Sequence, residues 1–89
     1  MKANLHAASF FGAFTTPQKL AIITAMLPEP INVTGIGRAV DLDQPMVSQI
    51  LAQFRSLGIV RREKQGRCLV YQIKNPEAMR QLLAIADNF

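Results

Sequence analysis

Residues 42–60 decide the fold, and they read LDQPMVSQILAQFRSLGIV. Apolar side chains recur there at the spacing i, i+3, i+4 and i+7, in the order Val47, Ile50, Leu51 and Phe54. This spacing predicts a helix over Gln44–Leu57 that buries one apolar stripe. Asp43 is a suitable N-cap and Pro45 fits the first helical turn, while Gly58 suits a left-handed stop.

The opposite face of this predicted helix is polar, and no acidic residue follows its cap. Its members are Gln44, Met46, Ser48, Gln49, Ala52, Gln53 and Arg55. A purely structural outer face more often carries Glu and Lys pairs. Amides and hydroxyls can instead donate to and accept from the edges of bases. The face is therefore a candidate for reading nucleic acid, the alternative being a polar face that contacts only water.

Three further helices are predicted before residue 42. Residues 3–14 have helical spacing and an unusually apolar surface. Thr16 and Pro17 begin a second helix, which ends before Pro28. Asn32 caps a short third helix through residue 40, and residues 41–43 make a tight turn. The expected inner face of that third helix is Val33, Ile36, Ala39 and Val40.

Residues 59–64 and 67–74 read as two strands joined by a turn in which Gly66 supplies a positive φ. The side chains expected to point inward are Leu69, Tyr71 and Ile73. Asn75 and Pro76 then open a last helix, predicted over residues 76–88. The order predicts a mainly α fold with a small β-hairpin: a helix-turn-helix at residues 32–57 followed by a wing at residues 59–74.

The positive charge is concentrated in this wing. Residues 55–67 hold Arg55, Arg61, Arg62, Lys64 and Arg67 against Glu63 alone, which accounts for the whole formal charge of +4. A focused basic patch on an otherwise neutral chain favours a local anionic partner, most often nucleic acid. The alternative is a solvated charged loop.

Length and composition exclude several other classes. Residues 1–89 suffice for a single domain, and 49% of them are hydrophobic, which excludes disorder. The longest apolar run has eight residues, far short of a membrane span, and the first residues lack a clear secretory cleavage site. A lone cysteine fits a reducing cytoplasm. No catalytic constellation is present, so we expect no enzyme and no cofactor.

Several segments of the chain together resemble ArsR-type winged-helix repressors. They are the stretch from Thr16 to Met26, the stretch from Asn32 to Leu42, the V-S-x-x-L and G-I-V pieces of residues 47–60, and the wing residues Gly66, Arg67 and Tyr71. The resemblance covers roughly residues 15–75. It implies a homodimeric transcriptional repressor whose first and last helices, here residues 1–14 and 76–89, form the dimer interface. That implication agrees with the apolar surfaces of both terminal segments.

Some family features are missing. Metal-sensing members carry a Cys-x-Cys type motif in the third helix, and residues 33–40 hold no cysteine. Other members use Asp and His ligands on the last helix, where this chain has Asp87 without a histidine. Metal sensing at those sites is therefore not expected. Asp43 and Ile50 stand where Ser and His are common in the family. The family's preference for particular DNA bases is therefore not expected to carry over to this chain.

The predicted partner is double-stranded DNA with a pseudo-palindromic operator. The predicted contact residues are Gln44, Pro45, Met46, Ser48, Gln49, Gln53, Arg55, Arg61, Arg62, Lys64 and Arg67. Base contacts are expected above all from Gln44, Ser48 and Gln49, and Arg55 either holds a phosphate or pairs with Asp41 or Glu63.

Three alternatives remain open at this stage. The wing could dock on an acidic protein. Cys68 could make the chain a redox-responsive regulator through an intersubunit disulfide, although a small residue with no role is the simpler interpretation. RNA binding ranks last, because the basic region lacks exposed aromatic side chains on which bases could stack.

Overall fold

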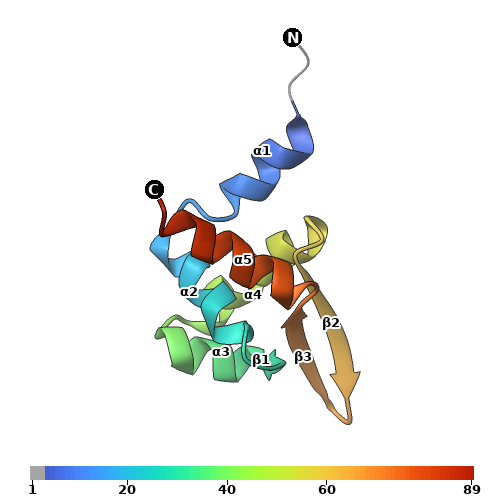
Figure 1. Cartoon of the computed structure of the whole chain (residues 1–89). Helices are drawn as coiled ribbons and strands as arrows, with labels where there is room; N and C mark the ends of the chain where they lie inside the picture. Colours follow the sequence, from blue (N-terminus) through green and yellow to red (C-terminus); the bar gives the residue numbers. More distant parts are fainter. Residues whose placement is uncertain (1–3) are drawn as a thin grey trace.

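The computed structural model describes residues 4–89 (Figure 1). Their elements are, in order, α1 (Leu5–Gly12), α2 (Pro17–Met26), β1 (Ile31–Asn32), α3 (Val33–Val40), α4 (Gln44–Ser56), β2 (Val60–Gln65), β3 (Cys68–Ile73) and α5 (Pro76–Ala86). This order confirms the predicted helical fold with a small antiparallel sheet. α1 is shorter than the predicted helix at residues 3–14, and the first three residues of the predicted dimerisation segment 1–14 lie outside the described part of the chain.

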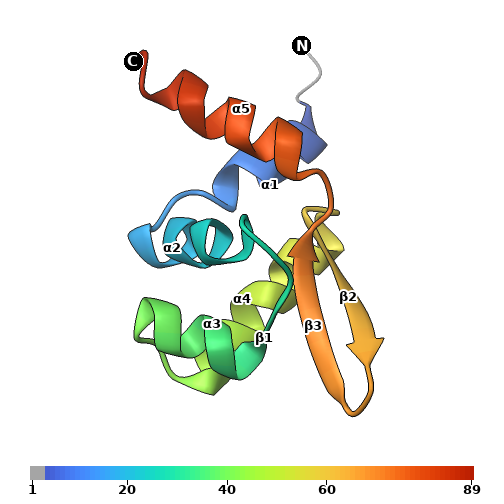
Figure 2. The same ribbon diagram turned by 60° about the horizontal axis from the view of Figure 1, so that its bottom comes forward.

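The elements divide between two ends of the molecule. α1 and α5 lie at one end, with α2 beneath them, whereas α3, α4 and the tip of the hairpin lie at the other (Figure 1 and Figure 2). The last helix ends at Ala86 and α4 at Ser56, slightly before the residues predicted. No helix within residues 4–89 is long and apolar enough to cross a membrane.

Side-chain caps fix where the helices of the body begin. Thr16 Oγ1 accepts a hydrogen bond from the Lys19 N–H at 3.2 Å, and Asn32 Oδ1 accepts one from the Gly35 N–H at 2.7 Å. Asp43 Oδ1 does the same for Met46 N–H at 3.1 Å. Each bond satisfies a backbone donor that has no partner inside the helix. The three predicted caps are therefore confirmed.

The connection between α3 and α4 depends on a close approach. Asp41 ends α3 with a left-handed φ of 57°, and the Leu42 N–H then donates to the Gly37 carbonyl at 3.1 Å. A Cβ at Gly37 would come within 3.0 Å of the Leu42 carbonyl oxygen. The glycine that weakens α3 as an isolated helix thus allows the tight turn that sets α4 against it.

The sheet has one strand that the sequence did not predict. β1 pairs antiparallel with β3, with Ile31 opposite Tyr71, and β3 also pairs with β2, giving the order β1-β3-β2. A two-residue strand is too short to show a period of two, so its pairing depends on distant residues. Gly66 has a φ of 62° at the hairpin turn, as predicted.

The core lies between the helices and the base of the hairpin. Its buried members are Ala13, Ile22, Ile23, Met26, Ile36, Val47, Leu51, Phe54, Ile59, Val60, Tyr71, Ile73 and Met79. Two predicted inner residues are wrong. Leu69 shares a strand face with Tyr71 but lies beyond the helices, near the hairpin tip, and is 42% exposed. Ala39 is exposed because the buried face of α3 turns toward Val33 and Val40.

Candidate nucleic-acid interface

The outer face of α4 points away from the core. Val47, Leu51 and Phe54 are fully buried and therefore fix the rotation of the helix about its axis. Every residue of α4 in the predicted DNA-contacting set is exposed: Gln44, Pro45, Met46, Ser48, Gln49, Gln53 and Arg55. The polar surface that the sequence indicates on this helix is thus free to meet a ligand.

Helical geometry divides this face into a centre and two edges. Residues seven positions apart lie almost in line along a helix. Ser48 and Arg55 therefore share one edge, and Met46 and Gln53 share the opposite one. Arg55 lines a cleft with β2, so its edge is the one that faces the hairpin. Gln49 lies near the centre, where a side chain can project straight into a groove.

The hairpin, here called the wing (β2, β3 and their turn), carries its cations on two faces. Arg62 pairs with Tyr71 and Lys64 with Leu69, so these two cations lie on the face that also bears the buried Val60. Arg61 and Glu63 lie on the reverse face, opposite Gln72 and Val70. The sequence grouped all wing cations together, whereas the strand alternation separates Arg61 from Arg62 and Lys64.

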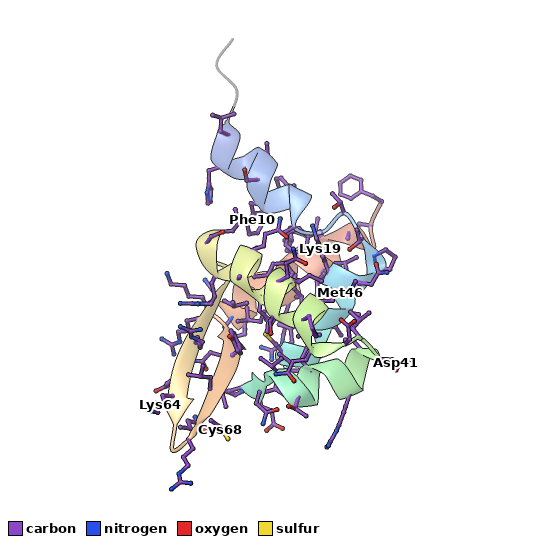
Figure 3. The ribbon with its side chains drawn as sticks, turned by 180° about the vertical axis from the view of Figure 1, so that it is seen from behind. Phe10, Lys19, Asp41, Met46, Lys64 and Cys68 are labelled. Atoms are coloured by element: carbon purple, nitrogen blue, oxygen red, sulfur yellow. The ribbon has the colours of Figure 1, made fainter. Side chains whose placement is uncertain are left out.

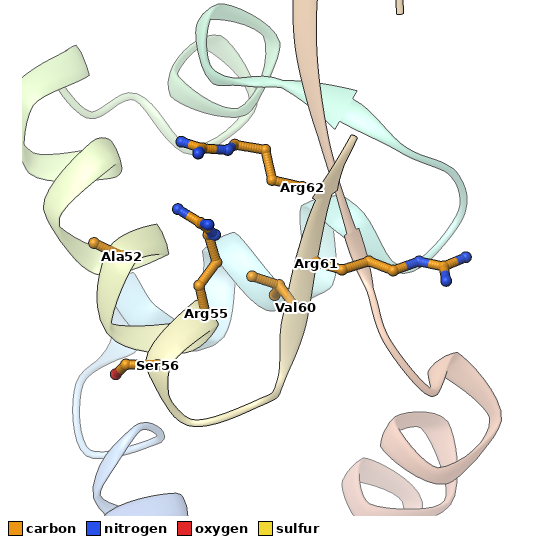
Figure 4. A pocket seen from close by; sticks show the side chains of 6 residues that line it. All are labelled: Ala52, Arg55, Ser56, Val60, Arg61 and Arg62. Atoms are coloured by element: carbon orange, nitrogen blue, oxygen red, sulfur yellow. The ribbon is translucent and has the colours of Figure 1, made fainter. Parts of the chain in front are cut away.

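Arg61 has a protein partner on the reverse face. With the Gln72 amide oriented so that its oxygen faces the guanidinium, that oxygen accepts hydrogen bonds from Arg61 Nε and from Nη2, the latter at 2.8 Å. This amide orientation is the one that satisfies both partners. This contact links Arg61 to the neighbouring strand β3. Figure 4 shows the Arg61 side chain extending to the side of β2 away from α4.

A cleft of about 540 Å³ separates the C-terminal half of α4 from the start of β2. It is lined by Ala52, Arg55, Ser56, Val60, Arg61 and Arg62. Figure 4 shows the guanidinium groups of Arg55 and Arg62 extending over the same side of β2, toward one another, while Arg61 extends to the other side. The fold therefore brings together two cations from different elements that are seven residues apart in sequence.

The remaining site residues lie at the margins. Arg67, in the hairpin turn, and Cys68, at the start of β3, are exposed. Figure 3 shows Cys68 near the tip of the wing, and its redox role stays a prediction. Arg38, which is not among the predicted contact residues, is exposed on α3 and lines a shallow hollow with Thr34 and Gln44. Arg38 follows the predicted inner residue Ile36 by two positions, and this spacing places it on the outer face of that helix. Within residues 4–89 no three His, Cys, Asp or Glu side chains gather as a metal site requires.

Comparison with known proteins identifies this arrangement. No protein-family model matches the chain. The chain is similar to the HTH-type transcriptional regulator NmtR of Mycobacterium tuberculosis, with 35% identity over 72 residues, which cover 81% of this chain and 60% of that protein. It is also similar to a transcriptional repressor SmtB homologue of Synechocystis, with 26% identity over 81 residues, which cover 91% of this chain and 61% of that protein.

The chain thus spans about three fifths of the length of these curated relatives. Among solved structures, it is similar to the homodimeric winged helix-turn-helix DNA-binding domain of Mb0332 from Mycobacterium bovis, described as a possible ArsR-family transcriptional regulator. The TM-score is 0.83 at 20% identity, and the match covers 92% of this chain and 79% of that chain. In fold, the chain is a winged helix-turn-helix domain, and its sequence is similar to those of curated transcriptional regulators.

Proposed function

We propose that the chain is a dimeric, sequence-specific DNA-binding regulator that represses transcription. The observation that carries the proposal is the exposed amide face of α4 beside a wing face that presents Arg62 and Lys64 without an acid. The curated relatives are named as a transcriptional regulator and a transcriptional repressor, which supports the same conclusion.

In this proposal α4 contacts the bases and the wing contacts the DNA backbone. A major groove about 12 Å wide admits a helix such as α4, and Gln44, Ser48 and Gln49 could then reach base edges. Met46, 44% exposed, suits the apolar methyl group of a thymine. Arg62, Lys64 and Arg67 would meet phosphates and so contribute affinity rather than sequence choice.

A second copy of the chain is the partner proposed for the other end of the molecule. Phe11 is 59% exposed and Ile85 is 52% exposed. Both belong to an apolar cleft of about 530 Å³ between α1, the start of α2 and α5, lined by Phe11, Phe14, Leu20, Leu82, Leu83, Ile85, Ala86 and Phe89. A patch of this kind on so small a domain favours a protein interface, and a two-fold dimer would cover it with itself.

Dimerisation gives the operator its expected form. A two-fold axis through α1 and α5 would present two α4 helices to one duplex, and so to two half-sites related as an inverted repeat. Half-sites about one helical turn apart place both helices on the same side of the DNA. Occupying such a site within a promoter would block transcription.

Fluorescence anisotropy tests the proposal. The purified chain is titrated against a labelled duplex from the promoter of its own operon and against a scrambled duplex, at physiological salt. We expect tighter binding to the promoter. Equal affinity for both duplexes would contradict sequence-specific repression. Salt-sensitive binding to an acidic protein, without DNA binding, would instead favour a protein-interaction module.

A further inference from the structure

We propose that Arg55 of α4 and Arg62 of β2 bind a single DNA phosphate between them, and that Arg61 takes no part in DNA binding. The inference rests on the proposed function and deepens it, because it assigns one phosphodiester to one cleft. It also replaces an undivided basic patch with two wing faces that have different roles.

The cleft has room for a small anion. Ala52 and Ser56 line the α4 side with short side chains, and Val60 forms a buried apolar wall. The cleft has a volume of about 540 Å³ and is open to solvent, and the guanidinium groups of Arg55 and Arg62 extend toward one another beside it (Figure 4). A phosphate group can therefore enter between the helix and the strand without displacing either element.

The charges around the cleft favour binding of an anion. Arg55 and Arg62 carry like charges toward the same space, and no acidic residue lines it. Glu63, the acid nearest in sequence, lies on the reverse face of β2 with Arg61. Among the described residues, neither Arg55 nor Arg62 pairs with Asp41 or Glu63. Two planar guanidinium groups can each donate two parallel hydrogen bonds to a phosphate, which would relieve their mutual repulsion.

The position of the cleft defines which phosphate it would hold. The cleft lies between the C-terminal half of α4 and the base of the wing, and hence between the element proposed to enter the major groove and the element proposed to reach the neighbouring backbone. A phosphate at the edge of the groove occupies this position. Contacts of this class fix the register of the protein on DNA without reading sequence.

The reverse face supplies a matched control. Arg61 is adjacent to Arg62 in sequence, has the same charge and is also exposed. Its guanidinium is already hydrogen-bonded to Gln72 on the side away from α4. Arg61 is among the residues that line the cleft, but its guanidinium extends to the other side of β2 (Figure 4). Replacing Arg61 therefore removes the same formal charge from the same strand and leaves both guanidinium groups of the proposed phosphate contact in place.

Anisotropy with a labelled random-sequence duplex tests the inference, since phosphate contacts do not depend on sequence. The variants are R55Q, R62Q, the double variant R55Q/R62Q, and R61Q. Because charge-assisted hydrogen bonds are lost, we expect R55Q and R62Q each to weaken binding at least about tenfold. The double variant should fall well short of the product of the two single effects, because both guanidinium groups serve one phosphate. R61Q should stay within about twofold of wild type.

Three results would overturn the inference. Equal losses for R61Q and R62Q would remove the distinction between the wing faces. Single effects that multiply in the double variant would assign the two arginines to separate phosphates. A wild-type chain that binds no duplex would remove the proposed function and the shared phosphate together, whereas the first two results leave DNA binding intact. Thermal melting by circular dichroism checks that all variants fold, as expected for exposed side chains.

Discussion

The end of the domain formed by α1 and α5 and the end formed by α4 and the wing leave opposite kinds of side chain exposed. At the first end, Leu5, Phe11 and Ile85 reach solvent. At the second end, amides and guanidinium groups predominate, beside the exposed Met46 and Leu69. Both ends pack on the same core, so the stability of the folded chain alone does not explain why their exposed side chains differ. It indicates two interaction surfaces, one suited to an apolar partner and one suited to a polyanion.

The largest expected effect concerns the charged end. With one phosphate shared by Arg55 and Arg62 and one each for Lys64 and Arg67, a dimer would neutralise about 6 phosphates and give a log–log salt slope near −5. Affinity for a duplex should then fall about thousandfold between about 50 and 200 mM salt. Anisotropy over a salt series measures the slope. A slope shallower than about −3 would show that the wing contributes little.

The next effect concerns the apolar end. Phe11→Asp places a charge in the proposed interface without disturbing the core, because Phe11 is exposed in the protomer. A buried charge without a partner costs about 3–5 kcal/mol, so we expect the dimer dissociation constant to rise more than about hundredfold. Sedimentation velocity measures the change in mass. Met46→Asp, an exposed apolar residue at the other end, is the control and should leave the mass unchanged.

If Phe11→Asp and Met46→Asp both give the same mass as wild type, the apolar end is not the dimer interface, and the two ends do not differ in the kind of partner they bind. A monomeric wild-type chain at micromolar concentration would contradict the dimer directly.

A smaller effect separates affinity from specificity at the charged end. Gln49→Ala removes an amide from the centre of the α4 face, where a bidentate contact to adenine gives about 1–3 kcal/mol of discrimination. We expect the preference for the operator over a scrambled duplex to fall by about tenfold or more. Competition binding measures the ratio. The control is Gln81→Ala, an exposed glutamine on α5, and equal behaviour of the two variants would contradict the assignment.

The smallest effect compares the helices as folding units. Asp43→Ala removes the cap of α4, a helix that buries Val47, Leu51 and Phe54, and should cost about 1 kcal/mol of unfolding free energy, or about 4–8 °C in Tm. Asn4→Ala removes the cap of α1, which buries none of its own residues. In the Phe11→Asp background, this second change should leave Tm within about 1 °C of its parent. Equal shifts would show that α1 folds with the body.

The sequence predicts the parts of this molecule whose signals are local. α4 could be predicted because its cap at Asp43, its apolar stripe and its stop at Gly58 all lie within sixteen residues. The turn at Gly66 is equally local. The strand Ile31–Asn32 could not be predicted, because it exists only through pairing with Tyr71 and Val70, some forty residues away.

The candidate site shows the same limit. The residue types on α4 and in the wing are visible in the sequence, and the alternation of Arg61 and Arg62 could be counted. The packing of Val60 onto the core decides which of the two faces α4, and that contact is made in three dimensions. The cleft between Arg55 and Arg62 depends on the same packing.

Selection of binding sites from random DNA tests the central claim most directly. The pooled duplexes are retained on the purified full chain and sequenced. Because two copies are proposed to present α4 to one duplex, we predict an inverted repeat whose half-site centres lie about one helical turn apart. Enrichment of a single isolated half-site, or of no sequence at all, would contradict it.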